Sequence, residues 1–280
     1  MELLEDIIEE IKSGRLNASN TSNLGIVINE DKPKIKIYYK KNLKNLASID
    51  FQSEINDYNN YFVSLNKVAD DDNLNRFTAR LVEMSQEQAS RLLKSFPLDY
   101  FKCDENFDLA INLSKMKVSN TRTDENSISA LYYLGFKEKL NKIINLKLYY
   151  MTRMYINKTV LQNNNYYFDY LSNQNINPFS KIVQIGFDFC EKTNENIHLV
   201  GLDISEKRVK YKMYFTAINS TLSDIITFLS NSIYGVILQN ESLANLAKYD
   251  QYLNSHISFT GFALCIDNNN ELKINLYYEF

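Results

Sequence analysis

The sequence predicts an α+β fold in which a ten-stranded antiparallel β-barrel, made of five repeated hairpins, is surrounded by α-helices. Short strands with alternating polar and apolar residues recur along the chain, and four of them carry lysine and tyrosine in the same register. Each of these strands follows another strand-like segment across a short polar turn. Because stretches with helical apolar spacing fill the connections, the repeating unit is a hairpin followed by helices.

Four hairpins are clear from the pattern. Their second strands read KIKIYYK, NLKLYYM, KYKMYFT and KINLYYE, and they begin at residues 34, 145, 210 and 273. The first strands are expected at residues 24–29, 128–136, 197–204 and 257–266. The turns NEDK, KEKLNK, SEK and DNNN contain residues whose side chains hydrogen-bond to the local backbone, as hairpin connections require.

A fifth, weaker hairpin is expected at residues 61–84. Its second strand, RFTARLV, places Arg76, Thr78 and Arg80 on one face and apolar residues on the other. With this copy the number of strands reaches ten. The chain has 7 glycines and 3 prolines and no linker rich in them, so we expect a single domain over residues 1–280.

Helices are expected between the hairpins, at residues 85–96, 177–193, 220–238 and 241–253. The first of these opens with Ser-x-x-Gln, which is a capping-box pattern. Residues 102–126 fit a strand as well as a helix, since FDLAINL has both alternating and helical apolar spacing.

Composition excludes several classes of protein. A 45% hydrophobic content supports a sizeable core, and a net charge of −3 argues against a nucleic-acid partner. The 3 cysteines are widely spaced, which favours small buried residues in a reducing cytoplasm over a disulfide or zinc site. The acidic start does not resemble a secretory signal and no apolar run approaches the ~20 residues that span a bilayer, so we expect no membrane partner.

The two faces of the repeated strands differ in character. Their apolar positions should face the helices: Ile35, Ile37, Tyr39, Leu146, Leu148, Tyr150, Val209, Tyr211, Met213, Phe215, Ile274, Leu276 and Tyr278. The lysine and tyrosine positions then face away. An open sheet would leave this second face in water, whereas a closed barrel would turn it inward. We favour closure because it removes exposed strand edges.

A closed barrel would have a strongly basic lumen. The cations on its wall would be Lys36, Arg80, Lys147, Lys210, Lys212 and Lys273. Crowding such charges without anions is costly, so the lumen implies an anionic ligand. Two residues beyond the aligned lysine position, which Asn275 occupies in the last copy, each strand carries a tyrosine: Tyr38, Tyr149, Tyr214 or Tyr277. Cations bind diphosphate and aromatic faces stabilise a carbocation, and prenyl transfer needs both.

The strand–strand–helix unit with K-x-Y on its second strand resembles the ABBA-type prenyltransferases. LVGLDISEKRVKYKMYF (residues 199–215) is similar to a hairpin of the bacterial aromatic branch. FTGFALCIDNNNELKINLYYEF (residues 259–280) is similar to the last hairpin of the bacterial and cyanobactin peptide branches. The resemblance implies a ten-stranded PT barrel ringed by helices. It also implies prenyl transfer from dimethylallyl or geranyl diphosphate to an aromatic small molecule or a peptide side chain, in secondary-metabolite or ribosomal-peptide biosynthesis.

The resemblance also assigns roles to residues. The diphosphate-binding positions fall on Lys36, Arg80, Lys147, Lys210, Lys212, Lys273 and Asn275, and the carbocation shield falls on Tyr38, Tyr149, Tyr214 and Tyr277. Many members carry a glutamate on the first strand, where this chain has Gly25, so Asp203 is the substitute that we expect as an acid, a base or a metal-coordinating residue. Some bacterial members use Mg²⁺ and others do not. The resemblance therefore permits Mg²⁺ without requiring it and names no metal ligand.

Two other readings of the pattern stay open. One is a non-catalytic barrel that binds a phosphorylated or isoprenoid ligand, and Gly25 and Asn275 favour it because the family has charged residues there. The other is a sheet-based nucleic-acid module, which the acidic charge balance disfavours.

Overall fold

The computed structural model describes part of the chain with its side chains and part as backbone alone. Side chains are described for residues 9, 13, 81, 84–116, 129–137, 144–152, 170–174, 178–205, 208–216, 218–231, 247–248, 250–255 and 258–278. The backbone alone is described for strand residues 21–28, 34–40, 61–65, 74–80, 138–139, 142–143, 155–156, 159–160 and 279.

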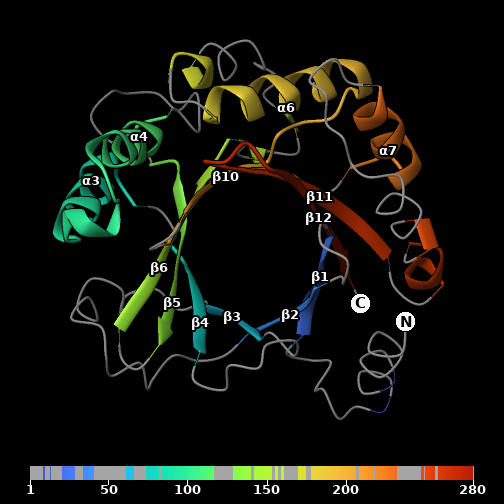
Figure 1. Ribbon diagram of the computed structural model, residues 1–280, viewed down its shortest axis with the longest axis horizontal. Coiled ribbons are helices and arrows are strands. Elements are labelled where there is room, and N and C mark those ends of the chain that lie inside the picture. Colours follow the sequence, from blue (N-terminus) through green and yellow to red (C-terminus); the bar gives the residue numbers. More distant parts are fainter. Residues whose placement is uncertain are drawn as a thin grey trace.

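The described backbone contains a closed antiparallel ring of strands (Figure 1). Its ten described members are β1 (Thr21–Ile28), β2 (Lys34–Lys40), β3 (Tyr61–Leu65), β4 (Leu74–Arg80), β5 (Leu131–Lys139), β6 (Lys142–Met151), β9 (Leu199–Ser205), β10 (Val209–Thr216), β11 (Ser258–Asp267) and β12 (Leu272–Glu279). Each predicted hairpin is present as a pair of adjacent strands. The ring closes because β1 pairs with β12 as well as with β2.

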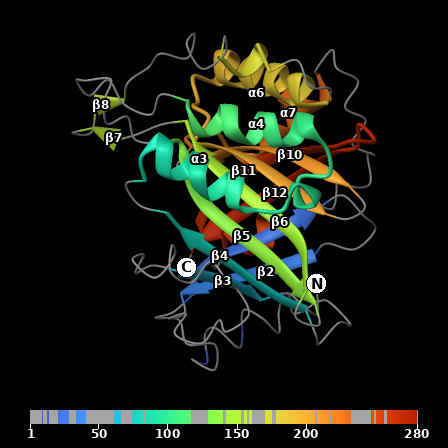
Figure 2. The same ribbon diagram turned by 90° about the vertical axis from the view of Figure 1, so that its left-hand side faces the viewer.

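Two details of the strands differ from the sequence prediction. The turn expected over KEKLNK is shorter, because β5 runs to Lys139 and β6 begins at Lys142 with a register irregularity between Lys137 and Glu138. Strand pairing thus continues through the lysines of this segment, although their polar side chains are typical of a loop. A two-stranded sheet of β7 (Tyr155–Ile156) and β8 (Thr159–Val160) was not predicted, and it lies apart from the ring (Figure 2).

Helices lie outside the ring, along β5, β6 and β9 to β12 (Figure 1). Those described are α3 (Gln86–Ser95), the 3₁₀ turn η2 (Leu98–Tyr100), α4 (Asp104–Ser114), α6 (Phe179–Thr193) and α7 (Leu222–Ser230). Residues 247–248 and 250–254 are helical as well and overlap the segment predicted at 241–253. The remainder of the predicted helix at 220–238 beyond residue 231 lies outside the described residues.

Local sequence explains where these helices begin. Ser85 accepts from the Gln88 amide at 3.1 Å and Gln88 accepts from the Ser85 amide at 2.8 Å, which confirms the predicted capping box of α3. The ambiguous segment 102–126 is helical over α4, because Leu109, Ala110 and Leu113 bury one side of it and α4 packs on β6.

The core lies between the helices and the outer face of the ring. As predicted, the apolar positions of β6, β10 and β12 are buried, namely Leu146, Leu148, Tyr150, Val209, Tyr211, Met213, Phe215, Ile274, Leu276 and Tyr278. Phe189 of α6 contacts Phe215 and Phe262 with ring centroids 5.1 and 5.0 Å apart. The side chains of Ile35, Ile37 and Tyr39 lie outside the described residues.

The cysteines and the membrane expectation can be compared with the described part of the chain. Cys190 and Cys265 are buried and Cys103 is exposed, so the expectation of burial was wrong for Cys103, which precedes α4. No helix among the described residues is long and apolar enough to cross a membrane.

The contact of Phe189 with both β10 and β11 should contribute strongly to stability. We expect Phe189→Ala to lower the free energy of unfolding by about 3–5 kcal/mol, because it leaves a cavity among buried aromatic rings. Urea denaturation followed by circular dichroism measures the change. The exposed Glu191 on the same helix gives a matched control, and Glu191→Ala should change stability by less than about 0.5 kcal/mol. Equal effects of the two variants would contradict the packing account.

Candidate active site

The predicted basic and phenolic residues of β6, β10 and β12 lie on the inner face of the ring, opposite the helix-covered outer face. Successive side chains of a strand point to opposite faces, so the burial of Tyr211, Met213 and Phe215 under the helices turns Lys210, Lys212 and Tyr214 inward. The same alternation turns Lys147, Tyr149, Lys273, Asn275 and Tyr277 inward on β6 and β12.

Cross-strand register decides which inner residues are neighbours. Lys212 lies opposite Gly201 of β9 on one side and Cys265 of β11 on the other. Gly201 is in turn opposite Tyr149, and Cys265 is opposite Lys273. A single cross-strand row therefore contains lysine and tyrosine together, because a closed barrel requires its strands to be staggered. The sequence predicted one ring of cations and a separate ring of phenols, each made of equivalent positions of successive hairpins. In the structure these equivalent positions are offset from strand to strand, so they do not share a cross-strand row.

Asp203 lies among three lysines, Lys147, Lys210 and Lys212, which are called the lysine cluster below. It pairs in register with Lys147 on one side and with Lys210 on the other. Its Oδ2 accepts a hydrogen bond from Lys212 Nζ at 2.9 Å, and its Oδ1 accepts one from the Asn145 side-chain amide. Asp203 is 9% exposed and Lys212 is 6% exposed, so this ion pair is almost fully removed from water.

Burial and charge act in opposite directions on this pair. Burial by itself would raise the pKa of Asp203, but the positive charges of Lys212 and Lys147 outweigh it and hold that pKa well below its ordinary value. Burial would lower the pKa of Lys212, but the negative charge of Asp203 outweighs it and the pKa lies well above its ordinary value. Both groups are therefore ionised near neutral pH. A carboxylate with a lowered pKa, held at both oxygens, suits a counter-ion better than the acid or base that we expected at Asp203.

Lys210 of the lysine cluster and Lys273 of β12 differ in their surroundings. Lys210 is half-buried, and burial lowers its pKa. Lys273 makes an ion pair with Glu271 at 3.4 Å. Asn275, which takes the lysine position in the last copy, is buried and hydrogen-bonds to Tyr277.

The inner tyrosines form a connected arc. Ring centroids lie 5.7 Å apart for Tyr149 and Tyr214 and 5.9 Å apart for Tyr214 and Tyr277. Tyr133 of β5 extends the arc, with its ring centroid 6.2 Å from that of Tyr149. We did not predict Tyr133, although its alternation with Gly135 and Lys137 could have indicated it. Burial raises the pKa of Tyr277 to about 12, so this phenol presents a neutral ring at physiological pH.

Because Gly201 has no side chain, two of these tyrosine side chains can lie close to the inner wall of the barrel. A Cβ at this position would lie 3.1 Å from Tyr149 and 3.3 Å from Tyr214, closer than side chains normally pack. In register, glycine also lies opposite the aligned lysine in two other hairpins, as Gly25 opposite Lys36 and Gly135 opposite Lys147. Gly25 stands where the family resemblance suggests glutamate. It is thus one of several glycines that lie opposite the aligned lysine.

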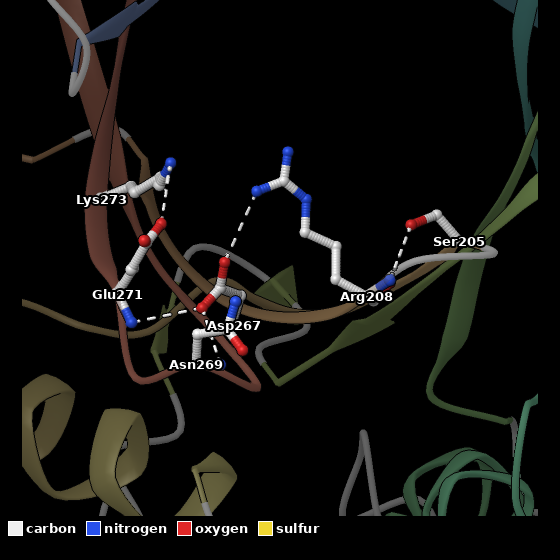
Figure 3. Close-up of polar contacts among 6 residues, drawn as sticks. All are labelled: Ser205, Arg208, Asp267, Asn269, Glu271 and Lys273. Atoms are coloured by element: carbon white, nitrogen blue, oxygen red, sulfur yellow. Dashed lines mark hydrogen bonds and ion pairs between the residues drawn. The ribbon is translucent and has the colours of Figure 1, made fainter.

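Further charges gather where the turns of the last two hairpins meet (Figure 3). Arg208, which precedes β10, approaches the Asp267 carboxylate at 3.6 Å. Asp267 also accepts from the backbone amides of Asn269 and Glu271 at 3.0 and 3.2 Å, so it fixes the β11–β12 turn. Sequence reasoning did not select Arg208, because it lies outside the repeated K-x-Y positions.

Some predicted residues are placed by backbone register alone. Lys36 lies opposite Gly25, and Arg80 lies opposite Tyr133. Tyr38 pairs with Asn23 and Ser64. The side chains of Lys36, Tyr38 and Arg80 lie outside the described residues.

The described residues do not fit a Mg²⁺ site. No group of three or more His, Cys, Asp or Glu side chains among them could hold a metal ion. Mg²⁺ bound with a diphosphate needs at least one carboxylate with available oxygens, and the Asp203 oxygens are engaged by Lys212 and Asn145.

No protein-family model and no curated protein matches the sequence. Solved structures do match. The crystal structure of AnaPT from Neosartorya fischeri has a TM-score of 0.58 and 9% identity, with 92% of this chain and 78% of that chain covered. The crystal structure of NotF prenyltransferase has a TM-score of 0.58 and 7% identity, with 92% and 80% covered. Both are ABBA-type prenyltransferases, and the chain has their fold.

The buried ion pair should make the protein sensitive to loss of one partner. We expect Lys212→Met to lower the free energy of unfolding by about 3–5 kcal/mol, because it leaves the Asp203 carboxylate buried without its cation. The double variant Lys212→Met/Asp203→Asn should recover most of this loss. Urea denaturation at neutral pH measures both, with Lys94→Met on the exposed side of α3 as control. A double variant no more stable than Lys212→Met would count against the pair.

The same pair predicts a pH dependence of stability. The pKa of Asp203 is lowered by folding, so its contribution is present above the unfolded value of about 3.9 and is lost as pH falls through the folded value. The pKa of Lys212 is raised, so its contribution is present below about 10.4 and is lost as pH rises through the folded value. We expect the stability difference between wild type and the double variant to be constant from about pH 5 to 9, and to shift in favour of the double variant outside that range. Unfolding curves across pH test this, and a difference that changes between about pH 6 and 8 would contradict it.

Proposed function

We propose that this protein transfers a prenyl group from an allylic diphosphate, dimethylallyl or geranyl diphosphate, to an aromatic small molecule or a peptide side chain. The observation that carries the proposal is the row in which Lys212 lies between Tyr149 and Lys273 on the inner face of the ring. Positive charge beside aromatic side chains suits an allylic diphosphate that ionises, because the cations bind the diphosphate and the aromatic rings stabilise the allylic cation. The fold shared with AnaPT and NotF prenyltransferase supports the same reaction class.

In this proposal the lysines stabilise the leaving group. The C–O bond of the donor breaks, its electron pair goes to the diphosphate, and negative charge increases on the departing oxygens. Lys212 is a fixed cation in a site removed from water, where its attraction for that charge is stronger than in solvent. Lys147, Lys210 and Lys273 surround it and would bind the other diphosphate oxygens.

The tyrosine arc would stabilise the allylic cation. Each ring that faces a cation contributes roughly 0.5–2 kcal/mol, and the contacts between Tyr149, Tyr214 and Tyr277 hold the rings in place. The arc would also limit access of water, so that the acceptor captures the cation first. The acceptor then forms the new bond and releases a proton to solvent or to the diphosphate.

The direct test is a transfer assay on the purified chain. Dimethylallyl and geranyl diphosphate are each incubated with tyrosine- and tryptophan-containing peptides, and separately with small phenols and indoles. We expect released diphosphate together with a product heavier than its acceptor by one prenyl group, detected by mass spectrometry. Binding of the donor without release under any acceptor would favour the alternative of a non-catalytic ligand-binding barrel.

The tyrosine arc yields a prediction for a single ring. Tyr214→Leu removes the ring between Tyr149 and Tyr277, and we expect kcat/KM to fall about 2- to 30-fold, the equivalent of one cation–π contact. Tyr214→Phe keeps the ring and loses only the hydroxyl, so it is the matched control and should retain most of the activity. Steady-state kinetics with saturating acceptor measures both. Equal losses in the two variants would show that the hydroxyl, and not the ring, is required.

A further inference from the structure

Asn145 of β6 makes two hydrogen bonds to the adjacent strand β9. It is 3% exposed, and its side-chain nitrogen donates to Asp203 Oδ1 and to the backbone carbonyl of Ile204, the latter at 3.0 Å. Both partners are acceptors, so the amide can be oriented in one way only, with its nitrogen toward them. Asn145 therefore ties the Asp203 carboxylate to a fixed point of the backbone.

The second oxygen of the same carboxylate holds Lys212. Asp203 Oδ2 accepts from Lys212 Nζ at 2.9 Å, so the three side chains form a chain from β6 through β9 to β10. The position of the ammonium group follows from that of the carboxylate, and the position of the carboxylate follows from Asn145. This connection spans three neighbouring strands and uses residues far apart in sequence.

We propose that Asn145 is a positioning residue, which fixes Asp203 and thereby holds the Lys212 ammonium group where the donor diphosphate binds. This inference rests on the proposed function for the identity of the ligand. The connection between Asn145 and Lys212 does not depend on the proposed function.

The chemistry of an amide explains why asparagine suits this place. An aspartate at 145 would bring a second carboxylate against Asp203, and one of the two would then take up a proton. An apolar residue would leave Asp203 Oδ1 buried without its donor, which is costly for a charged oxygen. Asparagine supplies the donor without adding charge.

Several titratable groups lie around Lys212 and its partner Asp203. These are Asp203 on β9, Lys210 on β10 itself, Lys147 and Tyr149 on β6, Cys265 on β11 and Tyr277 on β12. Burial lowers the pKa of Lys212, and Asp203 is the largest of the contributions that raise it. If the Asp203 carboxylate could turn away, it would oppose the effect of burial on the pKa of Lys212 less strongly. The pKa of Lys212 should then be lower than in the wild type.

The test compares Asn145→Val with Asn145→Thr. The two side chains have the same branched shape, but threonine keeps a hydroxyl donor for Asp203 and valine does not. The first readout is the titration of Lys212 in ligand-free protein, followed by NMR of labelled lysine side chains and assigned with a Lys212→Arg variant. We expect the pKa of Lys212 in Asn145→Val to fall by about one pH unit or more relative to wild type, and Asn145→Thr to remain nearer to wild type.

The second readout is binding of inorganic diphosphate by calorimetry near neutral pH, where Lys212 is charged in every variant. We expect Asn145→Val to lose about tenfold or more in affinity and Asn145→Thr to stay within about threefold of wild type. Asp203→Asn, which removes the carboxylate itself, should lower the pKa of Lys212 at least as far and serves for the first readout if Asn145→Val is unstable. Equal affinity of Asn145→Val and wild type, or a titration of Lys212 unchanged in both Asn145 variants, would overturn the proposal.

These readouts separate the inference from the proposed function. Wild type that binds inorganic diphosphate but never transfers a prenyl group would contradict the proposed reaction, while the shift in the Lys212 titration would still support the role of Asn145. Prenyl transfer with no shift in either variant would support the reaction and refute the positioning role.

Discussion

The pairing of β1 with β12 is the constraint on which the rest of this structure depends. Side chains alternate along every strand, and on an open sheet both faces would meet solvent or helices. Closing the ring gives the two faces different environments: one packs against α4, α6 and α7, and the other is enclosed by the wall itself. Phe215 and Phe262 belong to the first face, where Phe189 of α6 packs on them, and the inner lysines and tyrosines belong to the second.

Enclosure then imposes an electrostatic condition on the inner face. Lysines withdrawn from water need nearby anions, and the described residues provide them from outside the K-x-Y positions. Asp203 of β9 serves Lys212, and Glu271 serves Lys273. At least two lysines of the described inner face thus have carboxylate partners, so an anionic ligand would compete with or supplement these carboxylates.

Stagger between strands decides how the basic and aromatic residues combine. Equivalent positions of successive hairpins are offset by the register of a closed barrel, so Lys212 has Tyr149 and Lys273 in its own cross-strand row. A diphosphate and an allylic group have to lie side by side, and this arrangement brings their expected partners together more closely than two stacked rings would. Gly201 and Cys265, between these residues, leave room for the larger side chains.

Much of the fold followed from the sequence, because period-two alternation and polar turns are local properties that repeat. The hairpins, the capping box of α3 and the inward placement of Lys147, Lys212 and Tyr214 could all be predicted in this way. Local pattern did not decide α4, since FDLAINL fits two periodicities and burial against β6 selects the helix. It also missed Tyr133, which lies on a first strand beside a register irregularity between Leu131 and Tyr133.

The sequence by itself determined which residue types share a face of each strand, because that depends only on the alternation of neighbouring side chains. Tertiary structure decided which of those residues touch, because register, closure and stagger join positions that are far apart in the chain. Asp203 shows the difference most clearly. Its sequence neighbourhood left open an acid, a base or a metal ligand, whereas Asn145 and Lys212, brought to it by strand pairing, make it a buried counter-ion.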